Sequence, residues 1–529
     1  MSAESLAARG GPADVMPAAS RTRRPPAALI VLLVAVALAG TIGAIGGGNP
    51  VLGIVSAGAV LLALTMAIRP DYTALVVVGV LYSNAAVIAV QFHGVPYIAA
   101  AGVPFLLVVP VGYELIVRRR PIVVTSAFPL ISLFLLIQIV SALLADDVAS
   151  SAGDVEIFVV EGIGLYFMLT NTIRSLDTLR RVVWVLLAVG VFIGLLSAYQ
   201  DATKTYDNDY WGFAQMSQAT LDTGTTTLSG ATLQPRLAGP IGETNRYAQI
   251  MLMLVPLGLF WAVSARSRIP RLAAFAAAGA ASIGVALTFS RGAAVGFFLV
   301  LVIMVVLGYI KPIQLFVVSL GIALLLVAFP QYGSRVGSLV GTVTGDTASG
   351  SPDNAVLSRA TEAITAVLVF ADHPILGVGP GRFPSYYRLY ADDVGIAVKQ
   401  RDREAHDLYV GILAEDGIVG FVVFMGILAL TLRDLIRVRR RWLKSRPDIA
   451  AMATGLMLSI VTYMTTGLFL HLSYARYFWL MLALAGAAAH IGLELTEEAR
   501  RSKAQPIHAP AAAPALGAVS YLRRTGQRA

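Results

Sequence analysis

His406 is the residue in this chain best suited to proton transfer. It stands just before a long apolar run, with Glu404 and Asp407 beside it, and either carboxylate could orient the ring or raise its basicity. An imidazole with an ordinary pKa of about 6.5 can accept a hydroxyl proton and release it at neutral pH. We therefore predict that His406 is a general base, and that Arg403, Asp407 and Tyr409 contact the substrate. The alternative is a histidine hydrogen-bonded at a helix N-terminus.

Two arginines lie at the borders of apolar runs. Arg246 follows Glu243 and Asn245, and Arg291 follows Ser290 in a short turn. A guanidinium group presents paired N–H donors that fit two oxygens of a diphosphate. We predict that both arginines act on such an anion, with Glu243, Asn245 and Ser290 contacting the substrate. The alternative is that each arginine extends to lipid head groups.

Other polar residues in the same part of the chain are weaker candidates. Arg382 and Arg388 belong to a glycine-rich turn and the tyrosine-rich segment after it, and we predict that they contact the substrate. Glu415 is assigned to the site too, with satisfaction of backbone or arginine groups as its alternative role. His93 and His471 lack acidic neighbours, so neither is predicted to act as a base.

The composition is that of a membrane protein. Of 529 residues, 57% are hydrophobic and 13% are charged, and apolar runs reach about 18 residues, the length that crosses a bilayer. We predict an all-α polytopic membrane protein with about 14 transmembrane helices (12 to 14). The predicted spans are 27–45, 51–68, 72–90, 97–117, 122–144, 157–169, 182–199, 247–264, 272–289, 293–309, 313–329, 419–432, 449–470 and 477–493.

The basic residues predict the orientation, because Lys and Arg are retained on the cytoplasmic side during insertion. With the N-terminus inside, the inner segments hold 28 of the 40 Lys and Arg residues. Both termini are therefore predicted to be cytoplasmic, in a multi-pass protein of the cytoplasmic membrane. Residues 1–26 and 494–529 are predicted to be disordered tails around a transmembrane domain at 27–493. The long outer loops are 200–246 and 331–418.

The second outer loop is predicted to carry short helices. From Ser358 to Ala371 the pattern is that of an amphipathic helix, with Ile364 and Val367 on an apolar stripe and Glu362 opposite.

Several function classes are disfavoured. The chain has no cysteine, so a thiol nucleophile is excluded. The net charge of +9 follows from the cytoplasmic bias of basic residues and from contact with membrane lipids, so no nucleic-acid partner is predicted. Asp207 to Asp209 matches the short acidic pattern of metal-dependent sugar transferases, but a solvated loop is the better interpretation. No metal or other cofactor is predicted.

Four motifs, taken in order, resemble the O-antigen ligase/O-antigen polymerase superfamily of bacterial membrane proteins. The resemblance covers about residues 240–430. One departure is Asp407, where relatives commonly have asparagine after the histidine. The motifs are Gly242–Arg246, Thr288–Ala293, His373–Phe383, and Ala405–Tyr409 followed by Leu413–Gly420.

The resemblance implies a GT-C-like glycosyltransferase whose donor is a polyprenyl-diphosphate-linked glycan, without a nucleotide sugar or a metal. The acceptor would be a glycan, a lipid or a protein, at an extracytoplasmic site and within a possible envelope-biosynthesis complex. Arg246 and Arg291 match the family's essential arginines, and His406 matches its essential histidine. We expect one inverting displacement at the anomeric carbon, in which His406 deprotonates the acceptor hydroxyl.

Three alternatives stay open at this stage. The sequence does not separate a ligase, which moves a finished glycan, from a polymerase, which joins repeat units. A solute transporter similar to bicarbonate carriers is the second class, favoured by Glu161 and by the Pro and Gly breaks within 97–117. The third is a non-catalytic partner in envelope assembly.

Overall fold

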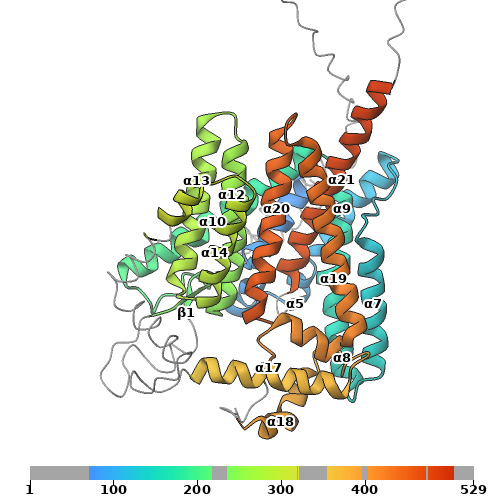
Figure 1. The fold of residues 1–529 in the computed structure, drawn as a ribbon, viewed down its shortest axis with the longest axis vertical. Coiled ribbons are helices and arrows are strands. Elements are labelled where there is room, and N and C mark those ends of the chain that lie inside the picture. The colour runs from blue at the N-terminus through green and yellow to red at the C-terminus, as the bar shows by residue number, and fades with distance from the viewer. Residues whose placement is uncertain are drawn as a thin grey trace, which may run out of the picture.

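The protein is a bundle of helices with a further helix, α17, lying across one end (Figure 1). The computed structural model describes residues 69, 71–216, 235–317, 320, 354–395, 403–471 and 475–504. Within these residues the fold is all-α apart from one antiparallel pair of very short strands, in which Gln215 pairs with Gly239.

The elements follow one another in this order: α3 (Asp71–Tyr82), α4 (Ala85–His93), α5 (Tyr97–Ala101), η1 (Pro104–Leu107), α6 (Val108–Gly112), η2 (Tyr113–Val117), α7 (Phe128–Leu143), α8 (Val148–Ile157), η3 (Phe158–Gly164), α9 (Leu165–Thr172), α10 (Leu176–Thr203), β1 (Gln215–Met216), β2 (Leu237–Gly239), α12 (Thr244–Ser264), α13 (Arg268–Leu287), α14 (Arg291–Val306), α17 (Asn354–Asp372), α18 (Phe383–Val394), α19 (Leu408–Trp442), α20 (Pro447–Thr466), η5 (Gly467–Phe469) and α21 (Ala475–Ala504).

Seven helical segments in the described residues are long and apolar enough to cross a membrane. An eighth span results if α3 and α4, which meet at a 55° bend, are counted as one. α7 and α14 are shorter apolar helices. The chain is therefore a multi-pass membrane protein, with seven or eight candidate spans where the sequence predicts about fourteen.

Every predicted span that falls on described residues coincides with helical structure. The span predicted at 97–117 has the same bounds in the structure, where it is assembled from α5, η1, α6 and η2. The spans predicted at 27–45 and 51–68, and most of the one at 313–329, lie outside the described residues. The predicted tail at 1–26 lies outside them as well, and α21 continues past the predicted boundary at 493.

Three helices form the centre of the bundle. In α12, α20 and α21, 83%, 83% and 78% of the most apolar window is buried, against 28–44% in the other spans. This difference places them in the interior, and they share one hydrophobic core. Because the start of α12 packs beside the end of α20, polar residues at these two termini are brought together.

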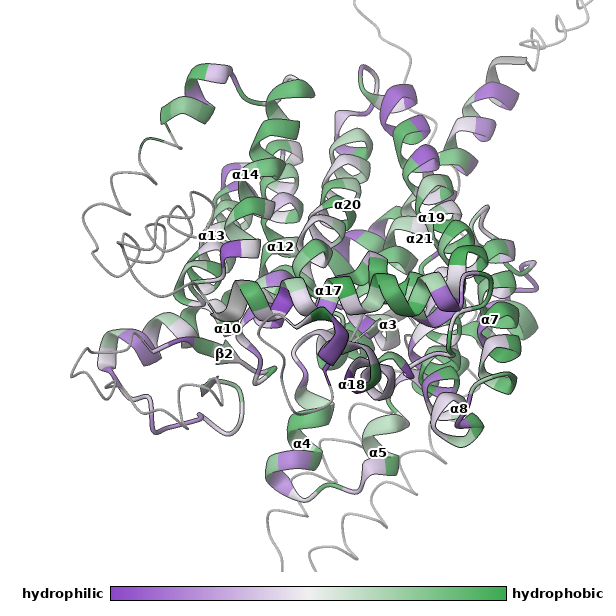
Figure 2. Cartoon of the chain, turned by 60° about the horizontal axis from the view of Figure 1, so that its bottom comes forward, coloured by the Kyte–Doolittle hydropathy of each residue, from purple (hydrophilic) through white to green (hydrophobic). Residues whose placement is uncertain are grey.

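α17 lies across this end of the bundle, which Figure 2 brings forward. Its apolar stripe faces away from the protein interior, since Ile364 and Val367 are 41% and 49% exposed. Its polar side faces inward, where Glu362 and Thr365 have no exposed surface. The predicted amphipathic helix is confirmed, but the residue expected opposite the apolar stripe is the buried one.

Candidate functional site

His406 sits in the turn before α19 in a left-handed conformation, with φ of 47°. Left-handed backbone is uncommon for residues other than glycine and often marks functional turns. Nδ1 of the ring lies 3.0 Å from the Glu404 carbonyl oxygen and 3.0 Å from Oε2 of Glu362. Both partners are acceptors, so Nδ1 carries the hydrogen in the neutral ring. Nε2 is then the unprotonated nitrogen and the one able to accept a proton.

The carboxylate beside the imidazole belongs to Glu362 on α17, and it is fully buried. Arg403 donates to Oε1 of Glu362 from Nε at 2.7 Å and lies 2.6 Å from it through Nη2, and the Ser358 hydroxyl donates to the same oxygen at 3.2 Å. Burial acts to raise the pKa of Glu362, but His406 and Arg403 outweigh it and hold that pKa below its ordinary value. Glu362 is therefore ionised at neutral pH and placed to stabilise an imidazolium.

The two acids next to His406 in the sequence have other roles. Glu404 contributes its backbone carbonyl to the ring, and burial raises the pKa of its side chain. Asp407 caps α19, because its carboxylate accepts from the backbone N–H groups of Tyr409 at 2.8 Å and Val410 at 3.2 Å. Asparagine is an equally good N-cap residue, so the departure at Asp407 preserves the capping geometry.

A second histidine joins this group. The rings of His406 and His471 meet edge to face with centroids 5.5 Å apart. Burial is the largest cause that lowers the pKa of His471 well below its ordinary value, and the positive charges of Arg246, His406 and Arg403 add to it. His471 is thus a neutral ring at neutral pH. His471 is not predicted from the sequence to belong to the site, because it has no acidic neighbour in the chain.

Arg246 reaches the same place from the start of α12, and it is 1% exposed. Its Nη1 donates to the His471 carbonyl at 2.7 Å and to Oε1 of Gln249 at 3.2 Å. The carboxylate of Glu243 caps α12 by accepting from the backbone N–H groups of Asn245 and Arg246, each at 3.0 Å. The structure therefore brings Arg246 and His406 together, with His471 as the residue that both contact.

Arg291 begins α14, directly after the capping residue Ser290, whose hydroxyl accepts from the Ala293 N–H at 3.4 Å. The next residue, Gly292, packs closely against the ring of Phe469 in η5. Gln249, one turn after Arg246, donates to Thr466 in the same part of the chain at 2.9 Å. The segments that carry the two arginines thus pack on a common feature, the end of α20 and the residues that follow it.

Arg236, which no sequence motif indicated, ties these two segments together. Its Nε donates to the Thr288 carbonyl at 3.0 Å, and its Nη2 donates to Oδ1 of Asn245 at 3.2 Å. A small hollow lies beside these contacts. Its lining includes Asn245, Ser290 and, from α17, Arg359. The hollow gives the predicted substrate-binding residues Asn245 and Ser290 a shared surface with an additional arginine.

Residues 275–425 match the family model described as O-antigen ligase. The chain is a membrane protein with an O-antigen ligase domain. No curated protein matches the chain in a sequence search. The matched residues contain Arg291, Glu362, Arg403 and His406, whereas Arg246 precedes them.

Several predicted site residues of the O-antigen ligase domain lie apart from the histidine pair. Arg382 is paired bidentately with Asp146, at 2.9 and 3.2 Å, and lies 3.5 Å from Asp147. Arg388 lies on α18 and is exposed. Oε1 of Glu415 accepts from the Phe383 N–H at 3.3 Å. Arg382 and Glu415 thus each join segments that are distant in sequence, and their contact with substrate stays a prediction.

Tyr409 has a comparable anchoring contact, because its hydroxyl donates to the Met464 carbonyl at 2.8 Å. This bond joins the first turn of α19 to the end of α20. It fixes the helix that begins directly after His406.

The glycine-rich turn after α17 is joined by backbone hydrogen bonds to a break in α19. Gly417, with φ of 65° and ψ of −170°, divides that helix. The N–H groups of Val378 and Gly379 donate to the carbonyls of Ala414 and Glu415, and the Ile418 N–H donates to the Pro374 carbonyl. Two motifs of the O-antigen ligase resemblance therefore form one interlocked support beneath α17.

The polar residue that favoured the transporter alternative is also paired. Oε1 of Glu161 lies 3.4 Å from Nη1 of Arg476, and Arg476 donates further to the side chain of Asn84. Asn84 occupies the bend between α3 and α4 in a left-handed conformation. The ion pair and the hydrogen bond together link η3, α21 and the bend between α3 and α4.

Proposed function

We propose that the O-antigen ligase domain transfers or polymerises a polyprenyl-diphosphate-linked glycan at the extracytoplasmic face of the cytoplasmic membrane. The observation that carries this proposal is the environment of His406. Nδ1 faces Glu362 and the Glu404 carbonyl oxygen, which leaves Nε2 as the base. His471 contacts both the His406 ring and, through its backbone carbonyl, Arg246. A base next to buried positive charge suits a donor whose leaving group is an anion.

In the proposed reaction, Nε2 of His406 accepts the proton of an acceptor hydroxyl while that oxygen attacks the anomeric carbon. The bond between this carbon and the diphosphate oxygen breaks, the configuration inverts, and polyprenyl diphosphate leaves with the bonding electrons. Glu362 balances the positive charge of the new imidazolium at 3.0 Å. Base catalysis of this kind contributes about 100- to 10,000-fold in rate.

Arg246 and Arg291 are proposed to hold the diphosphate. The leaving group is already stable as an anion, so the site has to neutralise charge and position the reactants more than donate a proton. Arg236 and Arg359 would add positive potential around the hollow beside Ser290. The helix start at Ser290 adds backbone N–H donors, which favour an anion in the same place.

The proposal extends to the architecture. It includes about fourteen spans arranged as in GT-C-like enzymes, both termini in the cytoplasm, and α17 on the extracytoplasmic side. The cytoplasmic excess of Lys and Arg supports this orientation. A lipid-linked donor would approach the base from the membrane, and an acceptor glycan, lipid or protein would approach from the side of α17.

The test uses purified full-length protein, a synthetic polyprenyl-diphosphate oligosaccharide and a candidate acceptor glycan. Release of polyprenyl diphosphate is measured for the wild type, His406→Ala, Arg291→Ala and the control His93→Ala. His93 is an exposed histidine at the end of α4. We expect the first two variants to lose at least about 100-fold in rate and the control to keep it. Unchanged release in both His406→Ala and Arg291→Ala would rule out this site.

Deletion of the gene separates the two transfer modes. Accumulated single repeat units indicate a polymerase, because units are made but not joined. Accumulated full-length polymer on its lipid carrier indicates a ligase, because the finished glycan is not passed on.

A further inference from the structure

A second polar cavity lies at the end of the bundle opposite His406. Its volume is about 320 Å³, within the range of small-ligand sites. It is formed where α10 begins, α12 ends and α20 begins, together with the turn between α12 and α13. The residues that matter here are Arg180, Trp184, Trp261, Arg266, Arg446 and Asp448.

The cavity is basic even after its internal ion pairs are considered. Nη2 of Arg180 lies 2.6 Å from Oδ2 of Asp448, and Arg446 contacts the same carboxylate through Nε at 3.1 Å and Nη2 at 2.9 Å. Arg180 has a second acidic partner, because its Nη1 lies 3.3 Å from Oδ1 of Asp177. With Asp448 and Asp177 both counted, the three lining arginines leave a net charge of +1. The carboxylate of Asp448 also fixes the guanidinium groups of Arg180 and Arg446 in place, and preorganised donors of this kind recognise phosphate oxygens well.

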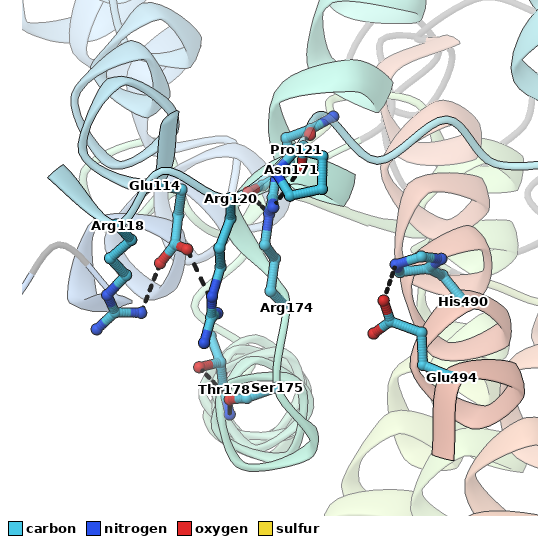
Figure 3. Close-up of polar contacts among 10 residues, drawn as sticks. All are labelled: Glu114, Arg118, Arg120, Pro121, Asn171, Arg174, Ser175, Thr178, His490 and Glu494. Carbon is cyan, nitrogen blue, oxygen red and sulfur yellow. Dashed lines mark hydrogen bonds and ion pairs between the residues drawn. The ribbon is translucent and has the colours of Figure 1, made fainter. Parts of the chain in front are cut away.

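Arg266 differs from other arginines at this end of the bundle. Arg118 lies 2.6 Å from Glu114, Arg120 lies 3.4 Å from the same acid, and Arg174 donates to the Pro121 carbonyl at 2.7 Å (Figure 3). Arg266 is exposed and forms no ion pair with any residue that the structure describes. It therefore brings a positive charge to the rim of the cavity without an internal partner.

Two tryptophans line the cavity next to the arginines. The rings of Trp184 and Trp261 meet edge to face, with centroids 6.4 Å apart and planes at 86°. Tryptophan is enriched where membrane proteins meet the head-group layer, because its ring is apolar and its N–H is polar. A wall of indole rings beside a basic group matches a ligand that has both an apolar part and an anionic head.

We propose that this cavity binds the phosphate group of an anionic ligand, with an anionic membrane lipid as its expected source. Basic pockets between transmembrane helices bind such head groups through the charges that the cavity presents. The inference is independent of the glycan chemistry, since the cavity lies at the other end of α12 and α20 from His406. Occupancy would anchor the ends of α10, α12 and α20 together.

The test is native mass spectrometry of the full-length protein in detergent, titrated with phosphatidylglycerol and, separately, with phosphatidylcholine. Arg266→Gln is compared with Arg268→Gln, an exposed arginine two residues away that does not line the cavity. We expect phosphatidylglycerol to bind about fivefold more weakly to Arg266→Gln, the effect of one basic residue near a phosphate, and with unchanged affinity to Arg268→Gln.

Competition with inorganic phosphate shows whether the bound phosphate group belongs to a lipid or to a soluble anion. If inorganic phosphate displaces phosphatidylglycerol, and displaces it less well from Arg266→Gln, the cavity is a phosphate site that also accepts a soluble anion. If phosphate has no effect while phosphatidylglycerol binding depends on Arg266, the ligand is a lipid. Equal binding of phosphatidylglycerol and phosphatidylcholine, or equal loss in Arg266→Gln and Arg268→Gln, would overturn the proposal.

Discussion

Nδ1 of His406 lies 3.0 Å from Oε2 of Glu362, a carboxylate with no exposed surface. The two residues come from different elements, the turn before α19 and the helix α17 that crosses the end of the bundle. The position of α17 therefore sets the orientation of the imidazole. Arg403 holds the other oxygen of the same carboxylate, so the pair belongs to a network of three charged groups.

Replacement of Glu362 by Gln should lower the rate of transfer at least about 100-fold. Glutamine keeps the size of the side chain but removes the negative charge that stabilises the imidazolium. Because Glu362 does not contact the donor in the proposed reaction, kcat should fall while KM for the lipid-linked glycan stays nearly constant. Initial rates of polyprenyl diphosphate release at several donor concentrations measure both quantities.

The matched control is Glu498→Gln, which alters an exposed acid on α21 far along the chain from the site. Monodisperse elution and thermal unfolding of each variant report whether the fold is kept. A Glu362→Gln protein that is folded and as active as the wild type would remove Glu362 from the mechanism.

His471 should make the protein sensitive to mild acid. Its pKa is well below the ordinary value of 6.5, so the unfolded chain binds a proton at this residue more readily than the folded chain does. Stability is then fully present above pH 6.5 and is lost as pH falls below it. The groups that oppose protonation are Arg246, His406 and Arg403. Thermal unfolding from about pH 7.5 to 5 should show a smaller decrease for His471→Gln than for the wild type.

His93→Gln is the control for this measurement, because His93 is an exposed histidine at the end of α4. The backbone carbonyl of His471 still accepts from Arg246 in the His471→Gln variant, so that contact is preserved. Parallel pH curves for the wild type and His471→Gln would show that burial of this ring does not couple to stability.

Arg236→Gln should reduce transfer about tenfold without abolishing it. Arg236 bridges the Thr288 carbonyl and the Asn245 side chain, and thereby holds the start of α14 against the start of α12. Small displacements of positioning groups cost one to two orders of magnitude in rate. The rate of Arg236→Gln is compared with that of Arg271→Gln, whose side chain donates to the Ala265 carbonyl at the other end of the bundle. Equal rates in the two variants would contradict a positioning role for Arg236.

Hydropathy places the predicted spans on helical structure wherever the structure describes them, because burial in lipid requires a continuous apolar run, and the run at 97–117 ends where its helix ends. Seven or eight of the described segments are long and apolar enough to span, where about fourteen are predicted. Charge near the membrane border also indicates Arg246 and His406, which the structure connects through His471. Glu362 could not be predicted as a site residue. Its burial depends on how α17 is oriented against the bundle, and the sequence of α17 alone does not set that orientation. The ion pair of Arg382 could not be predicted, because its partner Asp146 is distant in sequence. The contact between Arg246 and the His471 carbonyl could not be predicted either, because a backbone acceptor is present at every position of the chain.

Gly417→Ala should destabilise the support beneath α17. Gly417 has φ of 65°, a conformation that costs other residues about 1–3 kcal/mol, and a Cβ atom there would collide with the Ile375 carbonyl. Gly411→Ala is the control, since a Cβ at that helical position meets only the Ala405 side chain, at 3.5 Å. We expect a lower unfolding temperature and loss of activity for Gly417→Ala alone. Equal unfolding temperatures and activities of the two variants would show that Gly417 does not stabilise the break in α19.

The absence of native cysteine allows the orientation of the membrane domain to be tested by single substitutions. Ser385 is exposed on α18, and Ser267 is exposed in the turn between α12 and α13, where its hydroxyl caps no helix. With α17 outside, a membrane-impermeant maleimide applied to intact cells should label Ser385→Cys and leave Ser267→Cys unlabelled until the membrane is permeabilised. The opposite pattern would place His406 in the cytoplasm. A lipid-linked glycan presented on the outer face could then not be the donor, because the base and the reacting carbon would lie on different sides of the membrane.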